Sequence, residues 1–93
     1  CLKAAHLAEA FKMNYEIHHG GNSLNNVANL HLTMAIHNCE LFEVLLPAGA
    51  QKYGLVDEPA PDANGLVYAI EKPGLGAEID FDLIEKNKVA VLS

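Results

Sequence analysis

The fold is decided by the stretch Glu16-Ile17-His18-His19-Gly20-Gly21-Asn22, which joins a short candidate strand to a candidate helix. The strand is predicted at about residues 14–18, and it continues directly into a polar loop of histidine and glycine. The apolar residues that follow recur at spacings of three and four, which predicts a helix at about residues 24–36 with one buried stripe. A strand, a polar loop and a helix in this order are typical of an alternating α/β protein.

A second strand is predicted downstream, where the chain runs Leu41-Phe42-Glu43-Val44-Leu45-Leu46. This run is apolar on both faces except at Glu43, as expected for a strand of a parallel sheet or barrel that helices cover. Upstream of the first strand, apolar residues at helical spacing predict another helix over residues 2–11. We therefore expect an α/β fold with strands at about 14–18 and 41–46 and a helix at about 24–36 between them.

The second half of the chain has a different composition. Residues 53–73 are rich in Pro, Asp, Gly and Asn, which predicts an excursion from the layered core. Within this half we expect a short strand at residues 66–70 and a short helix at residues 83–86 capped by Asp80 or Asp82. The composition therefore divides the chain into residues 1–50 and residues 51–93.

Composition limits the partners and the location of the protein. The net charge is −6, with six lysines and no arginine, so neither nucleic acid nor a membrane surface is an expected partner. Cys1 and Cys39 form no disulfide framework, and no signal peptide or apolar run of about 20 residues is found, so a cytoplasmic location is expected. The chain starts at Cys1 on helix-like sequence, which predicts a part of a longer protein.

Two titratable residues at predicted strand ends form a candidate acid/base pair. His18 is a candidate general base, and the apolar neighbours of Glu43 should raise the pKa of that carboxyl, so a protonated Glu43 that donates a hydrogen bond is our hypothesis. The alternatives are a solvated turn histidine and an outward glutamate that forms a salt bridge. His31 is expected to be a hydrogen-bonded helix residue. Zinc is disfavoured because the histidines are poorly placed to share one ion.

Four motifs together carry a resemblance to a known family. They are residues 16–24 (Glu-Ile-His-His-Gly-Gly-Asn-Ser-Leu), 27–32 (Val-Ala-Asn-Leu-His-Leu), 35–43 (from Ala-Ile-His-Asn to Phe-Glu) and 73–80 (Pro-Gly-Leu-Gly-Ala-Glu-Ile-Asp). They resemble the C-terminal end of the enolase superfamily, in the mandelate racemase subgroup of the mandelate racemase/muconate lactonizing enzyme-like family. His37 departs from the pattern, since relatives often have Pro-Asn there.

The resemblance implies a modified TIM barrel, (β/α)7β, with an α+β capping domain. By this resemblance residues 1–50 are the last barrel helices and strands, and residues 51–93 are a C-terminal segment that returns to the capping domain. His18 corresponds to the general base after the seventh strand. Glu43 corresponds to the acid at the end of the eighth strand, which hydrogen-bonds to the carboxylate of the enediolate intermediate. His19 and Asn22 are candidate substrate-binding or loop residues.

The resemblance also implies parts of the site that this chain lacks. The ligands of Mg2+, a lysine and the aspartate that partners the histidine are expected upstream, so no metal ligand is predicted within this chain. The implied function is the C-terminal portion of an acid-sugar dehydratase that acts on a small-molecule carboxylate, an acid sugar or hydroxy acid. The alternatives are a racemase or epimerase of the same superfamily and a catalytically silent fragment or interaction module that self-associates. We expect the whole enzyme to be a homo-oligomer and the isolated chain to be inactive.

Overall fold

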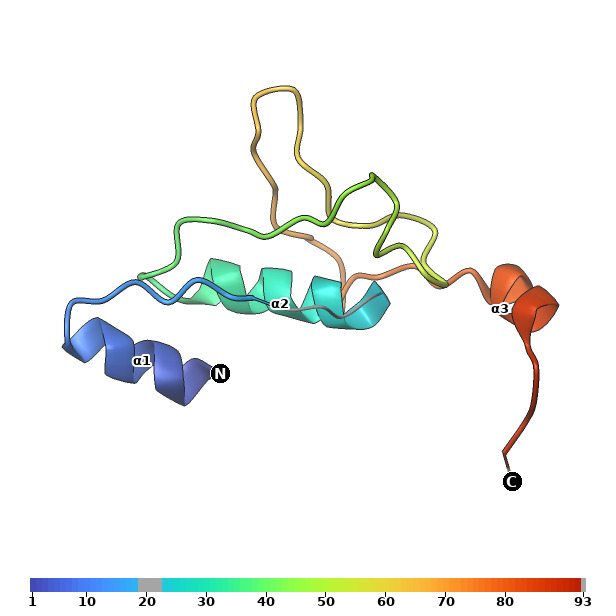
Figure 1. Cartoon of the computed structure of the whole chain (residues 1–93), viewed down its shortest axis with the longest axis horizontal. Helices are drawn as coiled ribbons and strands as arrows, with labels where there is room; N and C mark the ends of the chain where they lie inside the picture. Colours follow the sequence, from blue (N-terminus) through green and yellow to red (C-terminus); the bar gives the residue numbers. More distant parts are fainter. Residues whose placement is uncertain (19–22, 93) are drawn as a thin grey trace.

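The computed structural model describes residues 1–18 and 23–92, which contain three helices. These are α1 (Leu2–Ala10), α2 (Ser23–Ala35) and α3 (Phe81–Asn87). Figure 1 shows α2 near the middle of the long axis, with α1 toward one end and α3 toward the other. The connecting segments pass over α2, so this helix is the centre around which the rest is arranged.

The small core lies around α2. Val27 and Leu30 of this helix are each 1% exposed, and the spacing of three residues places them on one face. The buried apolar side chains in the described part of the chain are Ala5, Val27, Leu30, Ile36 and Leu55. Many other large apolar side chains are exposed, among them those of Phe11, Leu41, Leu46 and Val89. The described residues therefore contain many more large apolar side chains than they bury among themselves.

The strands predicted at 14–18 and 41–46 are not regular strands in the described residues. The two segments instead lie parallel and meet at one isolated bridge between Ile17 and Phe42. Tyr15 N–H also donates to the carbonyl of Asn38 at 2.7 Å. Next to the bridge, the side chain of Glu16 accepts from the amides of Glu40 and Leu41 at 3.3 and 3.0 Å. A pair of strands with so few rungs falls short of a regular ladder.

The strand predicted at residues 66–70 is also absent from the structure. This segment is one arm of a loop that projects away from α2 (Figure 1). Asp62 organises its tip, because Oδ1 accepts from the amides of Asn64 and Leu66 at 2.8 and 2.9 Å. Leu66 and Tyr68 are more than half exposed. The loop is thus held by a turn and not by strand pairing.

The last helix is longer than predicted. We expected residues 83–86, whereas α3 spans Phe81–Asn87. Asp80 is the N-cap, and its Oδ1 accepts from Leu83 N–H at 2.9 Å. Asp82 lies in the first turn and Lys86 in the last, where both charges favour the helix dipole.

The C-terminal half is attached to α2 by a turn. His31 Nε2 donates to the carbonyl of Leu75 at 2.9 Å, which confirms the expected hydrogen-bonded helix histidine. Gly76 has φ +68°, and a Cβ there would lie 2.3 Å from Ile70 Cγ2, so this turn requires glycine. An antiparallel bridge between Leu55 and Ile79 closes the segment. The division at residue 50 between barrel and capping parts stays a prediction.

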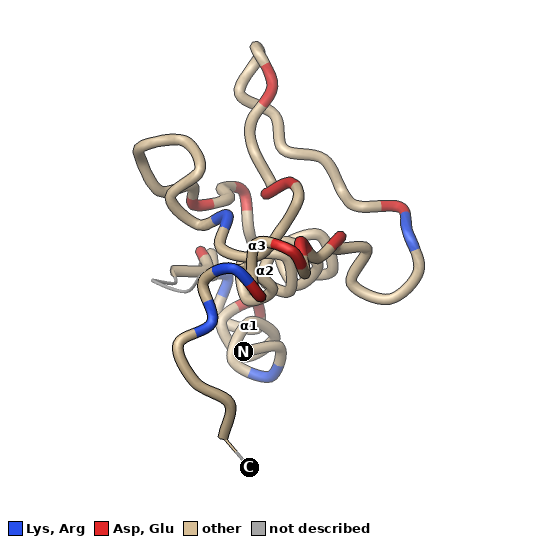
Figure 2. The backbone as a smooth tube through the Cα atoms, turned by 90° about the vertical axis from the view of Figure 1, so that its right-hand side faces the viewer, with Lys and Arg blue, Asp and Glu red and all other residues tan. Residues whose placement is uncertain are grey.

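Charge is spread along the chain. Figure 2 shows acidic residues on α3, on the projecting loop and on the connecting segments, whereas α2 contains none. In the part of the chain that the structure describes, no helix has the length and apolar character needed to cross a membrane.

Candidate active site

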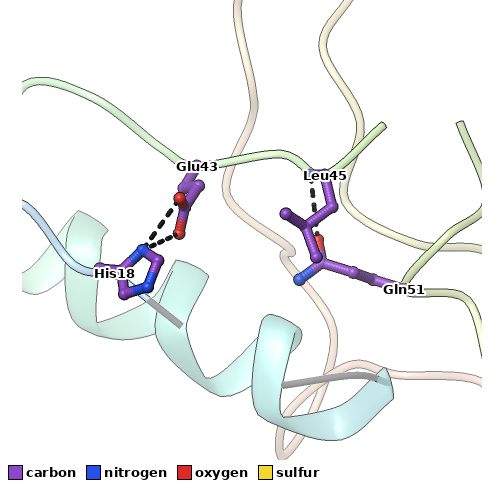
Figure 3. A network of polar contacts seen from close by, with 4 residues as sticks. All are labelled: His18, Glu43, Leu45 and Gln51. Atoms are coloured by element: carbon purple, nitrogen blue, oxygen red, sulfur yellow. Dashed lines mark hydrogen bonds and ion pairs between the residues drawn. The ribbon is translucent and has the colours of Figure 1, made fainter. Parts of the chain in front are cut away.

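His18 and Glu43 lie side by side because the residues before them pair. Ile17 and Phe42 form the parallel bridge, so the next residue of each segment extends in the same direction from it. Figure 3 shows the two side chains pointing toward one another. His18 Nδ1 is 3.0 Å from both carboxyl oxygens of Glu43. The structure therefore brings together the two residues that the sequence singled out.

This contact determines how the imidazole can act. When Glu43 is ionised, Nδ1 of His18 carries the proton that is donated to the carboxylate, and Nε2 retains a lone pair. When the ring is doubly protonated, the same contact becomes an ion pair. The His18 side chain is 84% exposed and that of Glu43 is 36% exposed, so Nε2 is accessible to a small molecule. The pair can thus accept and return a proton.

A hollow of about 370 Å³ adjoins the pair. Its lining is Glu16, Ile17, His18, Leu41, Phe42 and Glu43. A larger apolar hollow of about 770 Å³ lies between the start of α2 and α3, and its lining includes neither His18 nor Glu43. We assign the site to the smaller hollow because the titratable groups are there.

Glu16 is a polar residue of the site that the sequence analysis did not assign. Its Oε2 accepts from Leu41 N–H at 3.0 Å, from the Cys39 thiol at 3.2 Å and from Glu40 N–H at 3.3 Å. These donors, led by Leu41 N–H, lower the pKa of Glu16 below its ordinary value. Glu16 is therefore an anion that joins the His18 segment to the Glu43 segment. The feature of the sequence that could have identified Glu16 is its position two residues before His18.

The neighbouring Cys39 has the opposite shift. Burial first, and then the hydrogen bond to Glu16, raise the pKa of the Cys39 thiol. The thiol therefore stays protonated and serves as a donor.

Asn38 anchors the same segment to α1. Its side-chain Nδ2 donates to the backbone carbonyls of Ala5 and Met13, each at 3.0 Å. The backbone carbonyl of Asn38 accepts from Tyr15 N–H. The side chain and the backbone carbonyl of Asn38 thus join α1 to the segment that leads to His18. The sequence analysis noted Asn38 only as part of a motif.

Gln51 links the end of the Glu43 segment to the start of α2. Its carbonyl accepts from Ser23 N–H at 2.7 Å, and its Oε1 accepts from Leu45 N–H at 3.5 Å (Figure 3). Gln51 is 3% exposed, and its own N–H donates to the carboxylate of Glu58 at 3.2 Å. These bonds fix where α2 begins relative to the site.

Two predicted site residues cannot be placed. His19 and Asn22 lie outside the described residues. Within residues 1–18 and 23–92, no three His, Cys, Asp or Glu side chains gather closely enough to hold a metal ion. The resemblance places the Mg2+ ligands upstream of this chain, and that placement stays a prediction.

Comparisons with a family model, with known sequences and with solved structures all give matches over most of the chain. The sequence model of the enolase C-terminal domain-like family matches residues 1–83. A D-galactonate dehydratase from Xanthomonas oryzae pv. oryzae is 29% identical over 92 residues, which cover 92% of this chain and 24% of that protein. A D-galactonate dehydratase family member from Paenibacillus sp. is 37% identical over 82 residues, which cover 86% of this chain and 20% of that protein.

A solved structure is similar over almost the whole chain. It is a crystal structure from Pseudovibrio sp. of a protein provisionally described as a mandelate racemase/muconate lactonizing enzyme. The TM-score is 0.86 at 32% identity, and the match covers 96% of this chain and 24% of that one. The chain thus spans about a quarter of the length of the proteins it matches.

Proposed function

The chain belongs to the enolase C-terminal domain-like family of the enolase superfamily, and its fold fits part of a TIM-barrel-type enzyme; from this premise we propose that it contributes His18 and Glu43 to an active site completed by other polypeptide. In this proposal residues 1–50 are the end of a (β/α)7β barrel. Residues 51–93 return to the capping domain. The coverage of about a quarter of each relative supports this arrangement.

The proposed reaction is removal of the proton next to a substrate carboxylate, followed by loss of water from an acid sugar. The observation that carries it is the 3.0 Å contact between His18 Nδ1 and the carboxyl group of Glu43. Relatives named D-galactonate dehydratase support an acid sugar as the substrate class.

The chemistry follows from the two ring nitrogens of His18. The hydrogen on the carbon next to a carboxylate is weakly acidic, so a base near neutral pKa must be held against it. Nε2 takes this proton while Nδ1 stays hydrogen-bonded to Glu43, which stabilises the imidazolium that forms. Nε2 then returns the proton to the hydroxyl on the neighbouring carbon, the C–O bond breaks, and water leaves. The enol product becomes a 2-keto acid.

Glu43 has a second role in this proposal. When Glu43 is protonated, its carbonyl oxygen still accepts from His18 Nδ1, and its O–H donates a hydrogen bond to the substrate carboxylate as the enediolate develops. Because the same group contacts His18, the protonation states of the two residues are coupled. A pH profile of the rate therefore reports on the pair and not on either residue alone.

The Mg2+ that the family implies would be held by residues outside this chain. When bound there, it would stabilise the negative charge that develops on the substrate carboxylate.

Racemisation or epimerisation is the second candidate. The Pseudovibrio protein, described as a mandelate racemase/muconate lactonizing enzyme, supports it. It shares the first proton transfer and needs a second base on the opposite face of the substrate, which this chain does not supply in our proposal.

The test uses the full-length enzyme with Mg2+ and D-galactonate in deuterated water. We expect exchange of the proton next to the carboxylate, and formation of a 2-keto acid, to fall at least about 100-fold in His18→Asn, because general base catalysis is typically worth about 100- to 10,000-fold. His6→Asn, at an exposed position of α1, is the matched control and should keep the wild-type rate. Inverted substrate without keto acid would favour the racemase. Unchanged exchange in His18→Asn would contradict both.

A further inference from the structure

The segments that carry His18 and Glu43 are joined by four successive contacts. Tyr15 meets Asn38, the Glu16 side chain meets residues 39–41, Ile17 meets Phe42, and His18 meets Glu43. From the Ile17–Phe42 bridge to the His18–Glu43 contact, each segment advances by one residue, whereas between the Tyr15–Asn38 bond and that bridge one segment advances by two residues and the other by four. This alignment is the register that places Nδ1 against the carboxyl group.

The backbone specifies this register weakly. In the described residues the bridge between Ile17 and Phe42 is isolated, whereas a regular ladder has consecutive rungs. Sliding one segment by one residue displaces its side chains by about 3.3 Å and turns each to the opposite face. Such a slip would separate His18 from Glu43.

The carboxylate of Glu16 adds hydrogen bonds between the two segments next to the isolated bridge. It accepts from two consecutive backbone amides of the opposite segment, Glu40 N–H and Leu41 N–H, and from the Cys39 thiol. Asn14 Nδ2 donates to Oε1 at 3.4 Å from within the same segment. Charged acceptors form stronger hydrogen bonds than neutral ones, and two amides on one carboxylate fix position as well as distance.

We propose that Glu16 is a positioning residue that fixes the register in which His18 lies against Glu43. The inference rests on the proposed function, because it assigns Glu16 a role in presenting the base. Glu16 acts through the Leu41 and Glu40 amides and does not take part in proton transfer.

The first test is structural and needs no substrate. Crystal structures of the full-length protein are compared for wild type, Glu16→Gln and Glu40→Gln. Glu16→Gln keeps the size of the side chain and one acceptor oxygen, but it removes the negative charge and places an NH2 donor where Oε1 faces two other donors, Asn14 Nδ2 and Glu40 N–H. We expect the 3.0 Å contact between His18 and Glu43 to be lost in Glu16→Gln. Glu40→Gln removes the same charge from the next segment and should retain the contact.

The second test is kinetic. In Glu16→Gln we expect kcat for proton exchange with D-galactonate to fall about 10- to 100-fold, because misplacing a catalytic group by about 1 Å costs this much. KM should stay within about twofold, and Glu40→Gln should match the wild type. A merely structural loss would instead reduce the active fraction and leave the pH profile of the remaining enzyme unchanged, whereas lost contact with Glu43 shifts that profile.

The outcomes separate this inference from the proposed function. An intact contact and normal kcat in Glu16→Gln, together with an inactive His18→Asn, would overturn the inference alone. Full activity of His18→Asn would overturn the proposed function, and the crystal structures would still decide the role of Glu16. If Glu16→Gln and Glu16→Asp both fail to fold while Glu40→Gln folds, Glu16 is needed for folding and the inference is overturned.

Discussion

Replacing Asn38 by alanine should loosen α1 by a predictable amount. The substitution removes two hydrogen bonds from Nδ2, to Ala5 O and Met13 O, each at 3.0 Å and each worth about 1 kcal/mol net. It also removes Oδ1, which is buried with no hydrogen-bond partner among residues 1–18 and 23–92 and whose desolvation costs about 1 kcal/mol. The net loss in the local free energy of unfolding is about 1 kcal/mol. It rises to about 2 kcal/mol if water does not hydrate the freed carbonyls of Ala5 and Met13.

Native-state hydrogen exchange of the full-length protein measures this loss locally. A change of about 1 to 2 kcal/mol corresponds to roughly 5- to 30-fold faster exchange of the α1 amides. His37→Ala, at the exposed neighbouring position, is the control and should change these rates by less than about twofold. Exchange in Asn38→Ala that matches the control would refute the role assigned to Asn38.

Asn38→Asp adds a dependence on pH. The new carboxyl oxygens face two carbonyls, so ionisation is opposed and the folded-state pKa should lie above the unfolded value of about 3.9. A raised acid pKa means that stability is retained below about pH 3.9 and is lost as the pH rises through the folded-state pKa. We therefore expect Asn38→Asp to be more destabilised than Asn38→Ala at pH 7 but not at pH 4. Equal destabilisation at both pH values would contradict the donor geometry.

Three further predictions concern other parts of the chain. Glu16→Gln should speed alkylation of Cys39 by iodoacetamide at pH 7.5, because Glu16 helps to raise the thiol pKa and its loss increases the thiolate fraction; an unchanged rate, with Glu40→Gln as control, would count against the contact. Asp80→Ala should destabilise α3 by about 1 kcal/mol through loss of its cap, seen as faster amide exchange in residues 83–87, whereas Asp82→Ala should have a smaller effect. The isolated 93-residue chain should self-associate in sedimentation velocity, because many of its large apolar side chains are exposed; a monodisperse monomer would be evidence against this.

Helices were predictable because their signals are local. The apolar spacing placed α2 at residues 24–36, and the structure has Ser23–Ala35. The Asp80 cap was also visible in the sequence, since a cap needs only a side chain and the next turn of backbone. The extra residues of α3 at each end are the usual uncertainty of helix boundaries.

Strands were not predictable in the same way because they depend on partners. Residues 41–46 have strand composition, but a strand also needs a neighbouring backbone, and among the described residues this segment meets residues 14–18 at one isolated bridge. The sequence placed His18 and Glu43 at the ends of consecutive strands, and their direct contact is seen only in the structure. The hydrogen bonds of the Glu16 and Asn38 side chains to distant backbone groups could not be predicted, because such contacts produce no periodic pattern in the sequence.

The hydrogen bond from His31 to Leu75 has a consequence for recombining this chain with its relatives. A chimaera that exchanges everything after residue 50 would separate the helical donor from the turn that accepts from it. Gly76 and Ile70 are already matched to each other by their close approach, so the turn must be transplanted with residue 70. The natural unit of exchange is therefore residues 70–76 together with the histidine of α2, although these lie on opposite sides of the predicted domain boundary.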